Sequence, residues 1–77
     1  MSEKLPVVSG KDAIKALSKA GFRVTRQKGS HVRLEKIEPS KILKLTIPLH
    51  ETLKKGTLRQ IISDAGMSVE EFAKLLS

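Results

Sequence analysis

Two short runs of alternating apolar and polar residues, joined by Gly29 and Ser30, constrain the fold of this chain more than any other feature. Alternation with a period of two is typical of a strand that buries one face, and a two-residue link containing glycine is typical of a β-hairpin. We therefore predict antiparallel strands over residues 22–28 and 31–37. The pattern assigns to the core the side chains of Phe22, Val24, Val32 and Leu34, and to the open face those of Arg23, Thr25, Gln27, His31, Arg33 and Glu35.

A third strand is predicted after a polar turn at residues 38–41. Its apolar residues alternate with polar ones, so one set faces the core and the other shares the open face of the hairpin. Pro48 ends this strand because proline has no N–H to donate to a neighbouring strand. The inward set is Leu43, Leu45 and Ile47, and the open set is Lys44 and Thr46.

Capping residues and helical spacing predict a first helix over residues 9–20. Ser9 is a suitable N-cap, and Asp12 lies three residues further on, which is the spacing of a capping box. Gly21 follows the last apolar position and is typical of a helix C-terminus, where the chain turns into the left-handed region.

Two more helices are predicted after the strands. One starts at Gly56, with Thr57 and Gln60 at capping-box spacing, and ends at Gly66. A short last helix opens with the capping box of Ser68 and Glu71. Apolar residues at helical spacing predict the buried side of these two helices: Leu58, Ile61, Ile62 and Ala65 in the first, and Val69, Phe72 and Leu76 in the second.

The predicted order is therefore one helix, three strands, one helix and a short C-terminal helix. Three short strands with tight links form an antiparallel meander, and its one apolar face must be covered by the helices. This predicts an α+β two-layer sandwich. A chain of 77 residues has room for one core, so we expect a single domain over residues 1–77, with residues 1–8 as an extended N-terminal arm because Pro6 disfavours a helix there.

Charge indicates the kind of partner. Fifteen Lys and Arg face eight Asp and Glu, a net charge of +7, which attracts polyanions and speeds encounter with them. Nucleic acid is the leading candidate partner, and an anionic protein is the second. The alternative is a solvated basic surface that has no binding function. Two phenylalanines are the only aromatic residues, which argues against base stacking and favours contact through phosphates.

Composition also excludes several classes of chemistry. The absence of cysteine excludes disulfides, thiolate catalysis and the common zinc knuckles. A domain of this size has no enclosed chamber, which disfavours cofactor chemistry and favours a large external substrate. No apolar run approaches the roughly 20 residues of a membrane span, so we expect no membrane contact and a cytoplasmic location.

His31 is the leading catalytic candidate. Imidazole takes up and releases protons near neutral pH, and RNA can be cleaved when a base activates a 2′-hydroxyl for attack on the adjacent phosphate. Cations can stabilise the charge that develops, so neither metal nor cofactor is required. Lys28, Arg26 and Arg33 are candidates for that task, while Gly29 allows close backbone approach and Ser30 adds a donor. The alternative is an exposed histidine without a role.

Two further stretches are candidates for supporting the site. His50 follows the third strand and is a candidate for a partner acid or base, an RNA contact or a loop-fixing hydrogen bond; two histidines without a third ligand do not predict a metal site. Lys54 and Lys55 precede a helix N-terminus, where backbone N–H groups favour phosphate. The alternative there is a solvated loop.

The order and spacing of several short motifs resemble the HicA toxin family. They are Gly21-Phe22, Lys28-Gly29-Ser30-His31, Thr46-Ile47-Pro48-Leu49-His50, the run of residues 55–62, and Ala65-Gly66-Met67-Ser68, so the resemblance runs from about Ser9 to Leu76. It implies a fold like that of double-stranded-RNA-binding domains. It also implies a ribonuclease toxin that cleaves mRNA and arrests translation, and a HicB-type antitoxin that covers its active site.

The resemblance assigns the family's catalytic histidine to His31. Its Pro-x-His element falls on Pro48 and His50, and its Lys-Gly-Thr-Leu element on residues 55–58. We therefore expect a metal-independent endoribonuclease, with RNA contacts from Arg26, Arg33, Lys44, Lys54 and Lys55. The competing interpretations are a non-catalytic module that binds structured RNA and a module that binds only an acidic protein.

Overall fold

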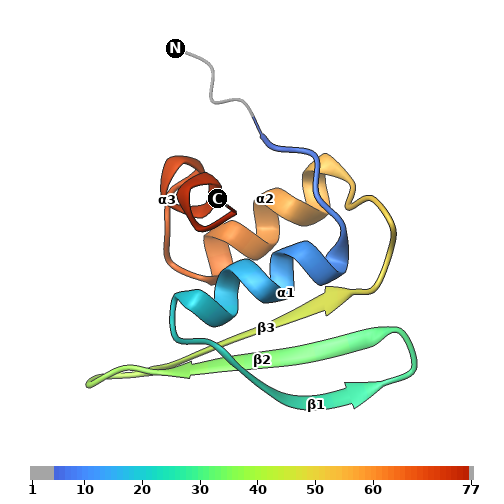
Figure 1. Ribbon diagram of the computed structural model, residues 1–77. Helices are drawn as coiled ribbons and strands as arrows, with labels where there is room; N and C mark the ends of the chain where they lie inside the picture. Colours follow the sequence, from blue (N-terminus) through green and yellow to red (C-terminus); the bar gives the residue numbers. More distant parts are fainter. Residues whose placement is uncertain (1–4, 77) are drawn as a thin grey trace.

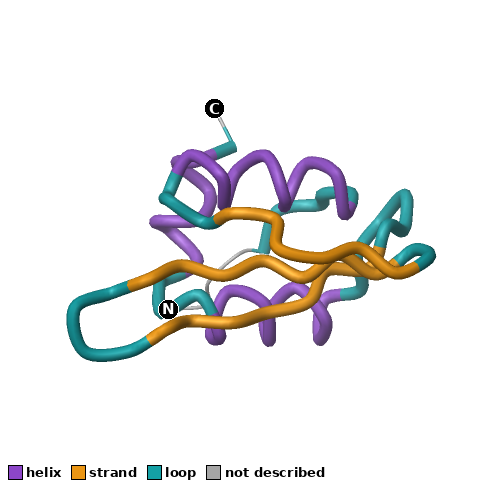
Figure 2. The backbone as a smooth tube through the Cα atoms, turned by 90° about the horizontal axis from the view of Figure 1, so that it is seen from below, coloured by secondary structure: helices purple, strands orange, loops and turns teal. Residues whose placement is uncertain are grey.

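An antiparallel sheet with helices on one face forms this protein (Figure 1). The computed structural model describes residues 5–76, which form the elements α1 (Gly10–Lys19), β1 (Arg23–Lys28), β2 (His31–Ile37), β3 (Ile42–Pro48), α2 (Lys55–Asp64) and α3 (Val69–Leu75). The strands follow one another in the order β1-β2-β3. This arrangement confirms the predicted α+β two-layer class. Figure 2 looks onto the sheet from the side opposite the helices, so that its open face is in view.

The predicted caps of two helices are confirmed. Ser9 accepts a hydrogen bond from the Asp12 backbone N–H at 3.0 Å, and Ser68 accepts one from the Glu71 N–H at 3.1 Å; both are full capping boxes. Gly21 ends α1 with φ at +101°, a conformation that glycine adopts without a steric penalty. Local chemistry therefore fixes where α1 and α3 begin and where the chain turns into β1.

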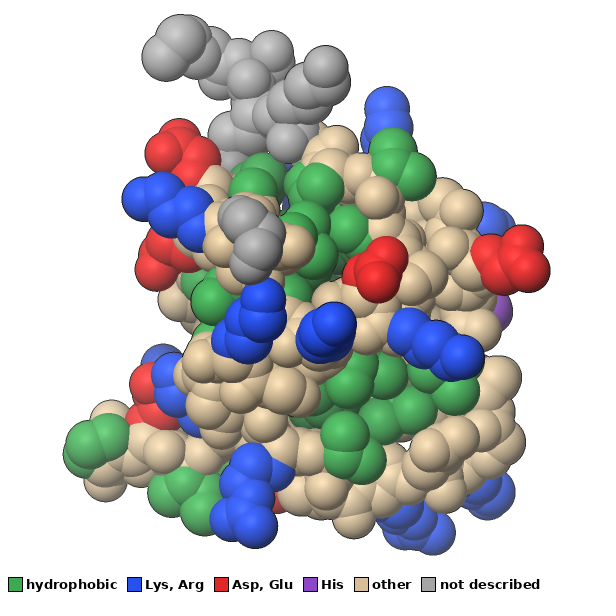
Figure 3. Space-filling view, in the orientation of Figure 1, with side chains coloured by type: hydrophobic (Ala, Val, Ile, Leu, Met, Phe, Trp, Pro, Cys, Tyr) green, Lys and Arg blue, Asp and Glu red, His purple; other side chains and the backbone are tan. Residues whose placement is uncertain are grey.

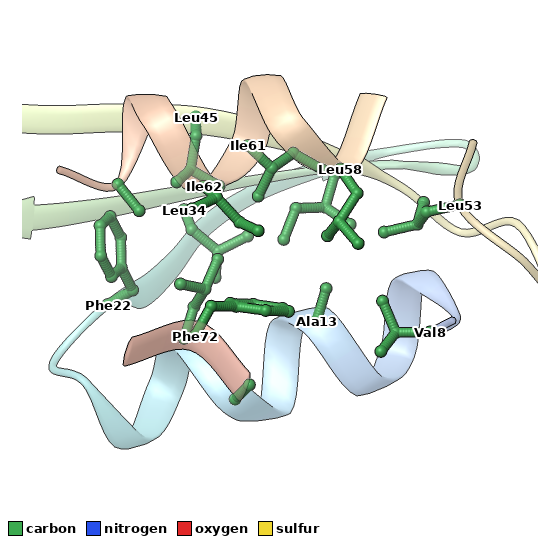
Figure 4. Packing of buried hydrophobic residues seen from close by; sticks show 14 of the residues in the cluster. Val8, Ala13, Phe22, Leu34, Leu45, Leu53, Leu58, Ile61, Ile62 and Phe72 are labelled. Atoms are coloured by element: carbon green, nitrogen blue, oxygen red, sulfur yellow. The ribbon is translucent and has the colours of Figure 1, made fainter. Parts of the chain in front are cut away.

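The core lies between the sheet and the helices, where side chains from every layer meet (Figure 4). The largest fully buried side chains are Phe72, Leu17, Leu34, Ile47 and Leu58. The segment before α1 also contributes, because Val8 is buried and its carbonyl accepts a hydrogen bond from the Leu53 N–H at 2.8 Å. Residues 5–9 form neither helix nor strand, and residues 1–4 of the expected arm lie outside the described part of the chain.

The predicted start of α2 is wrong by about one residue, and the predicted capping box of Thr57 and Gln60 does not form. Lys54 is the N-cap, without a side-chain hydrogen bond, and Thr57 lies inside the first turn. The Gln60 side chain does not reach back to the cap; its Nε2 donates to the Asp64 carboxylate one turn later, at 2.8 Å. The helix starts earlier because burial of Leu58, Ile61 and Ile62 sets its extent. None of the described helices is long and apolar enough to cross a membrane.

The predicted burial of Val24 is also wrong, because this side chain is 51% exposed. Val24 pairs with the buried Leu34 and so lies on the helix side of the sheet, as its alternation predicted. However, β1 is an edge strand whose main neighbour is β2, while the helices pack chiefly over β3. The alternating pattern identifies the face on which a side chain lies, but not how far the helices extend over it.

The loop after β3 is fixed by backbone hydrogen bonds on both sides. The Gly10 N–H at the start of α1 donates to the His50 carbonyl at 2.9 Å, and the Leu49 N–H donates to the Ser30 carbonyl at 2.7 Å. A Cβ atom at Gly10 would clash with the Pro48 carbonyl oxygen, so only glycine lets α1 approach this closely. The start of α1, the loop after β3 and the hairpin turn therefore form one connected unit.

We expect Gly10→Ala to lower the free energy of unfolding by about 1–3 kcal/mol, since the added methyl group must displace backbone. Gly56→Ala is the matched control, because no atom lies within 4 Å of a Cβ at that position and alanine favours helix. Urea unfolding followed by circular dichroism compares the two variants. Equal stability of both would contradict the close packing of α1 on this loop.

Candidate functional site

His31 opens the central strand and lies on the open face of the sheet. It pairs with Lys28 of β1 on one side and with Pro48 of β3 on the other. Directly paired residues of antiparallel strands point to the same face, and the next residue, Val32, is buried on the helix side. The imidazole is therefore exposed beside a lysine, as the alternating pattern predicted for His31.

A β-bulge in β1 brings a further cation to this face. Val24 pairs with Leu34, whereas Arg26 pairs with Arg33, so Thr25 is an extra residue in β1. Strict alternation would place Arg26 on the same face as Val24. The bulge shifts the alternation by one residue, as bulges beside functional sites commonly do, and Arg26 faces the open side with Arg33.

The same bulge corrects the prediction for Gln27. This residue pairs with Val32 and so belongs to the helix side of the sheet, not to the open face. Its Nε2 donates to the Gly29 carbonyl at 3.3 Å, which ties the side chain to the hairpin turn. Thr25 stays on the open face, where its hydroxyl lies 3.5 Å from a Glu35 carboxylate oxygen.

These side chains surround a shallow depression of about 260 Å³ on the open face. All three strands contribute to its lining, which consists of Arg26, Lys28, His31, Arg33 and Thr46. The lining holds three cations, one imidazole and one hydroxyl, but no carboxylate. Within the described part of the chain, no acidic group lies in ion-pair range of these cations. Such a surface suits an anionic ligand that approaches from solvent.

The remaining predicted site residues lie outside the depression. Lys44 is on the same face, further along β3, opposite Glu35. Lys54 and Lys55 are exposed at the N-terminus of α2, and His50 is exposed in the loop after β3. His50 is tied to the rest of the protein through its backbone carbonyl.

Thr46 is the lining residue that sequence reasoning did not assign to the site. The alternation of residues 43–47 places it on the open face, but its position beside Arg33 depends on the register of β2 and β3. That register follows from the length of the turn at residues 38–41 and from the buried partners Leu34 and Leu45. The sequence pattern could therefore show that Thr46 lies on the open face, but it could not show that Thr46 lies beside Arg33.

The hairpin turn is built as the sequence predicted. Gly29 has φ at +59°, and Ser30 does not share a positive φ, which is the arrangement of a two-residue turn with glycine at its first central position. The Ser30 carbonyl is held by Leu49, so this turn is fixed relative to β3. Among residues 5–76, no group of three potential ligand side chains of the His, Cys, Asp or Glu type is placed to hold a metal ion.

Together, fold and site define a small α+β protein with a cationic, histidine-bearing sheet face. Comparison with family models gives a match over residues 10–67 to the HicA toxin of bacterial toxin–antitoxin systems. Because the match covers most of the chain, this protein belongs to the HicA toxin family. Membership of a toxin–antitoxin family implies an antitoxin as a partner. A search of curated proteins found no match.

Gly29→Ala should destabilise the protein by about 1–2 kcal/mol, because a Cβ atom is strained at positive φ. Ser30→Ala is the matched control, since it changes the neighbouring exposed residue without altering the required conformation. Thermal unfolding provides the comparison. A Gly29→Ala protein as stable as the Ser30→Ala protein would show that the turn does not depend on glycine.

Proposed function

We propose that this protein is a metal-independent endoribonuclease toxin that cleaves mRNA with His31 as general acid and base. The observation that carries the proposal is the convergence in one open depression of His31 with three cations, none of which lies in ion-pair range of an acidic group of residues 5–76. Membership of the HicA toxin family supports it. Cleavage of mRNA arrests translation, and we propose that a HicB-type antitoxin in the same cytoplasm neutralises the toxin.

The proposed reaction starts with a proton transfer to the neutral imidazole of His31 from a ribose 2′-hydroxyl. The 2′-oxygen attacks the adjacent phosphorus, the bond to the 5′-oxygen breaks, and the departing oxygen takes up a proton from the imidazolium. The products are a 2′,3′-cyclic phosphate and a 5′-hydroxyl. Exposure of His31 at the start of β2 supports this role, because both the 2′-hydroxyl and the departing 5′-oxygen of the RNA must come within hydrogen-bond distance of the imidazole.

The cations have the second proposed task. Negative charge builds up on the non-bridging phosphate oxygens as the 2′-oxygen attacks, and donors held in place beforehand stabilise it. Arg26 and Arg33 offer planar guanidinium groups that suit phosphate, and Lys28 lies next to His31 across the hairpin. Gly29 and Ser30 support the site by holding that hairpin in shape.

The other basic residues are proposed to bind flanking phosphates. Lys54 and Lys55 start α2, which has neither a side-chain cap nor an acidic residue in its first turn. No acidic side chain in this first turn competes with a phosphate for the first backbone N–H groups of the helix. Lys44 extends the cationic surface along β3. His50 has a supporting role, because its carbonyl fixes the loop that in turn holds Ser30.

We expect His31→Ala to lower the rate of RNA cleavage by about 10²–10⁴-fold, since it removes the proton-transfer group. Because the side chain is exposed, the fold and the cations remain, and RNA affinity should change less than about threefold. The measurement is a gel assay of a 5′-labelled RNA, with electrophoretic mobility shifts for affinity. His50→Ala is the control, for which less than a tenfold loss is expected.

The same gel assay separates the competing functions. Cleavage that persists in EDTA supports the metal-free mechanism, whereas loss in EDTA with recovery on adding a divalent ion would contradict it. Intact RNA recovered from tight, salt-dependent complexes of the unmodified chain would favour a binding module instead. Unchanged cleavage by His31→Ala would refute the assignment of the site.

A further inference from the structure

The open face of the sheet changes character along its length. His31, Arg33, Glu35 and Ile37 follow one another on this face of β2, so its polar end and its apolar end are about 20 Å apart. Ile37 pairs with Ile42 of β3, and both point away from the helices. They are 78% and 52% exposed. A cationic depression at one end thus continues into an exposed isoleucine pair at the other.

Exposed apolar side chains gather at this end of the sheet. Four large hydrophobic residues among residues 5–76 are strongly exposed, and three of them lie at the end of the sheet opposite His31: Ile37 and Ile42 on the open face, and Val24 at the edge strand on the helix side. Hydrophobic atoms are visible on the surface there, at the lower left of Figure 3. The fourth is Val7, in the segment before α1.

A hollow of about 340 Å³ adjoins the isoleucine pair. It is lined by Gly21, Arg23, Val24, Thr25, Glu35 and Ile37. A hollow lined by both apolar and polar side chains can receive one or two side chains of a protein partner, as the central pockets of protein interfaces do. Exposed isoleucine offers RNA neither a cation nor an aromatic surface, and the hollow is lined by one carboxylate, Glu35, as well as one cation, Arg23, so it has no excess positive charge to attract phosphate.

We propose that the isoleucine pair and the adjoining hollow anchor the antitoxin, separately from the site that binds RNA. This inference rests on the proposed function for the location of RNA. The partner that fits is a protein with an apolar ridge for Ile37 and Ile42 and with carboxylates directed at Lys44, Arg33 and Arg26 further along the strands. A partner anchored at the apolar end and extended along β2 covers His31 and excludes RNA.

Charge favours this occupant over a second copy of the chain. Two copies joined through this face would bring together molecules that each carry a net charge of +7. Like charges facing each other weaken such an association, whereas an acidic partner gains from the same groups. The apolar end supplies contact area, and the cationic end favours a partner with negative charge.

The test compares Ile37→Thr/Ile42→Thr with Val7→Thr. Threonine keeps the β-branch that strands favour but adds a hydroxyl, and Val7 is 84% exposed outside the sheet. The probe is the protein encoded by the reading frame adjoining this chain's gene, titrated by calorimetry into His31→Ala backgrounds so that no toxic activity interferes. We expect the isoleucine variant to bind at least tenfold more weakly, and the Val7 variant to bind within twofold of the parent.

RNA cleavage by the two variants, made with His31 intact, is the second readout. Both should cleave within twofold of the unmodified chain, and cells expressing the isoleucine variant should stay arrested when the antitoxin is co-expressed. Binding unchanged in the isoleucine variant would overturn the proposal, as would absence of binding by the parent. Loss of cleavage in the isoleucine variant alone would show that the pair binds RNA. If the unmodified chain forms a dimer and the isoleucine variant is a monomer, the pair serves self-association instead.

Failure of the proposed ribonuclease would appear differently from failure of this inference. If the chain cleaves no RNA but Ile37→Thr/Ile42→Thr weakens antitoxin binding, the proposed antitoxin anchor is supported and the proposed ribonuclease activity is refuted. If the chain cleaves RNA and both variants bind the antitoxin equally well, the proposed ribonuclease activity is supported and the proposed antitoxin anchor is refuted. Calorimetry and the gel assay therefore answer the two questions independently.

Discussion

The site depends on the pairing of the central strand with both of its neighbours at the point where β2 begins. There, Lys28, His31 and Pro48 lie side by side on three strands. Two backbone hydrogen bonds fix this end of the sheet, one from Leu49 to Ser30 and one from Gly10 to His50. A functional group at the end of an isolated hairpin would be poorly positioned, because two-stranded hairpins are marginally stable in water. The third strand and the start of α1 supply the missing rigidity.

Small size explains why the site lies on the surface. The helices bury one face of the sheet, and the buried side chains that the strands contribute to the core all come from that face. The open face is then available for charge, at little cost in stability, because its cations remain solvated. A substrate that brings its own large surface suits this design better than a small molecule that must be enclosed. RNA and a protein antitoxin, the two partners proposed for this face, both meet that condition, and the proposals place their main contacts on different parts of it.

Much of the fold was predictable because its signals are local. Ser9 with Asp12 and Ser68 with Glu71 form the capping boxes that their spacing indicated, and Gly29-Ser30 forms the hairpin turn. Thr57 and Gln60 have the same capping spacing but form no cap, because burial of the Leu58 stripe extends α2 to Lys55. Val24 is exposed because the helices do not cover the edge strand, a tertiary fact that alternation does not contain.

The candidate site was predictable for β2 and less so for its neighbours. His31 and Arg33 lie where alternation placed them, whereas Arg26 reaches the open face through a bulge that the sequence of β1 does not reveal, and Gln27 leaves it for the same reason. Thr46 joined the site only through strand register. Cross-strand neighbours depend on pairing between distant residues, so a pattern along one strand cannot supply them.

The proposed chemistry depends on the binding of RNA phosphate in the depression beside His31. This binding is tested most directly by nuclear magnetic resonance of the ¹⁵N-labelled protein, titrated with an RNA whose 2′-hydroxyls are all methylated so that it binds but cannot be cleaved. We expect the largest backbone amide shifts on the residues that line the depression: Arg26, Lys28, His31, Arg33 and Thr46. Shifts concentrated on the exposed lysines of α1, Lys11 and Lys15, with the sheet unchanged, would contradict it.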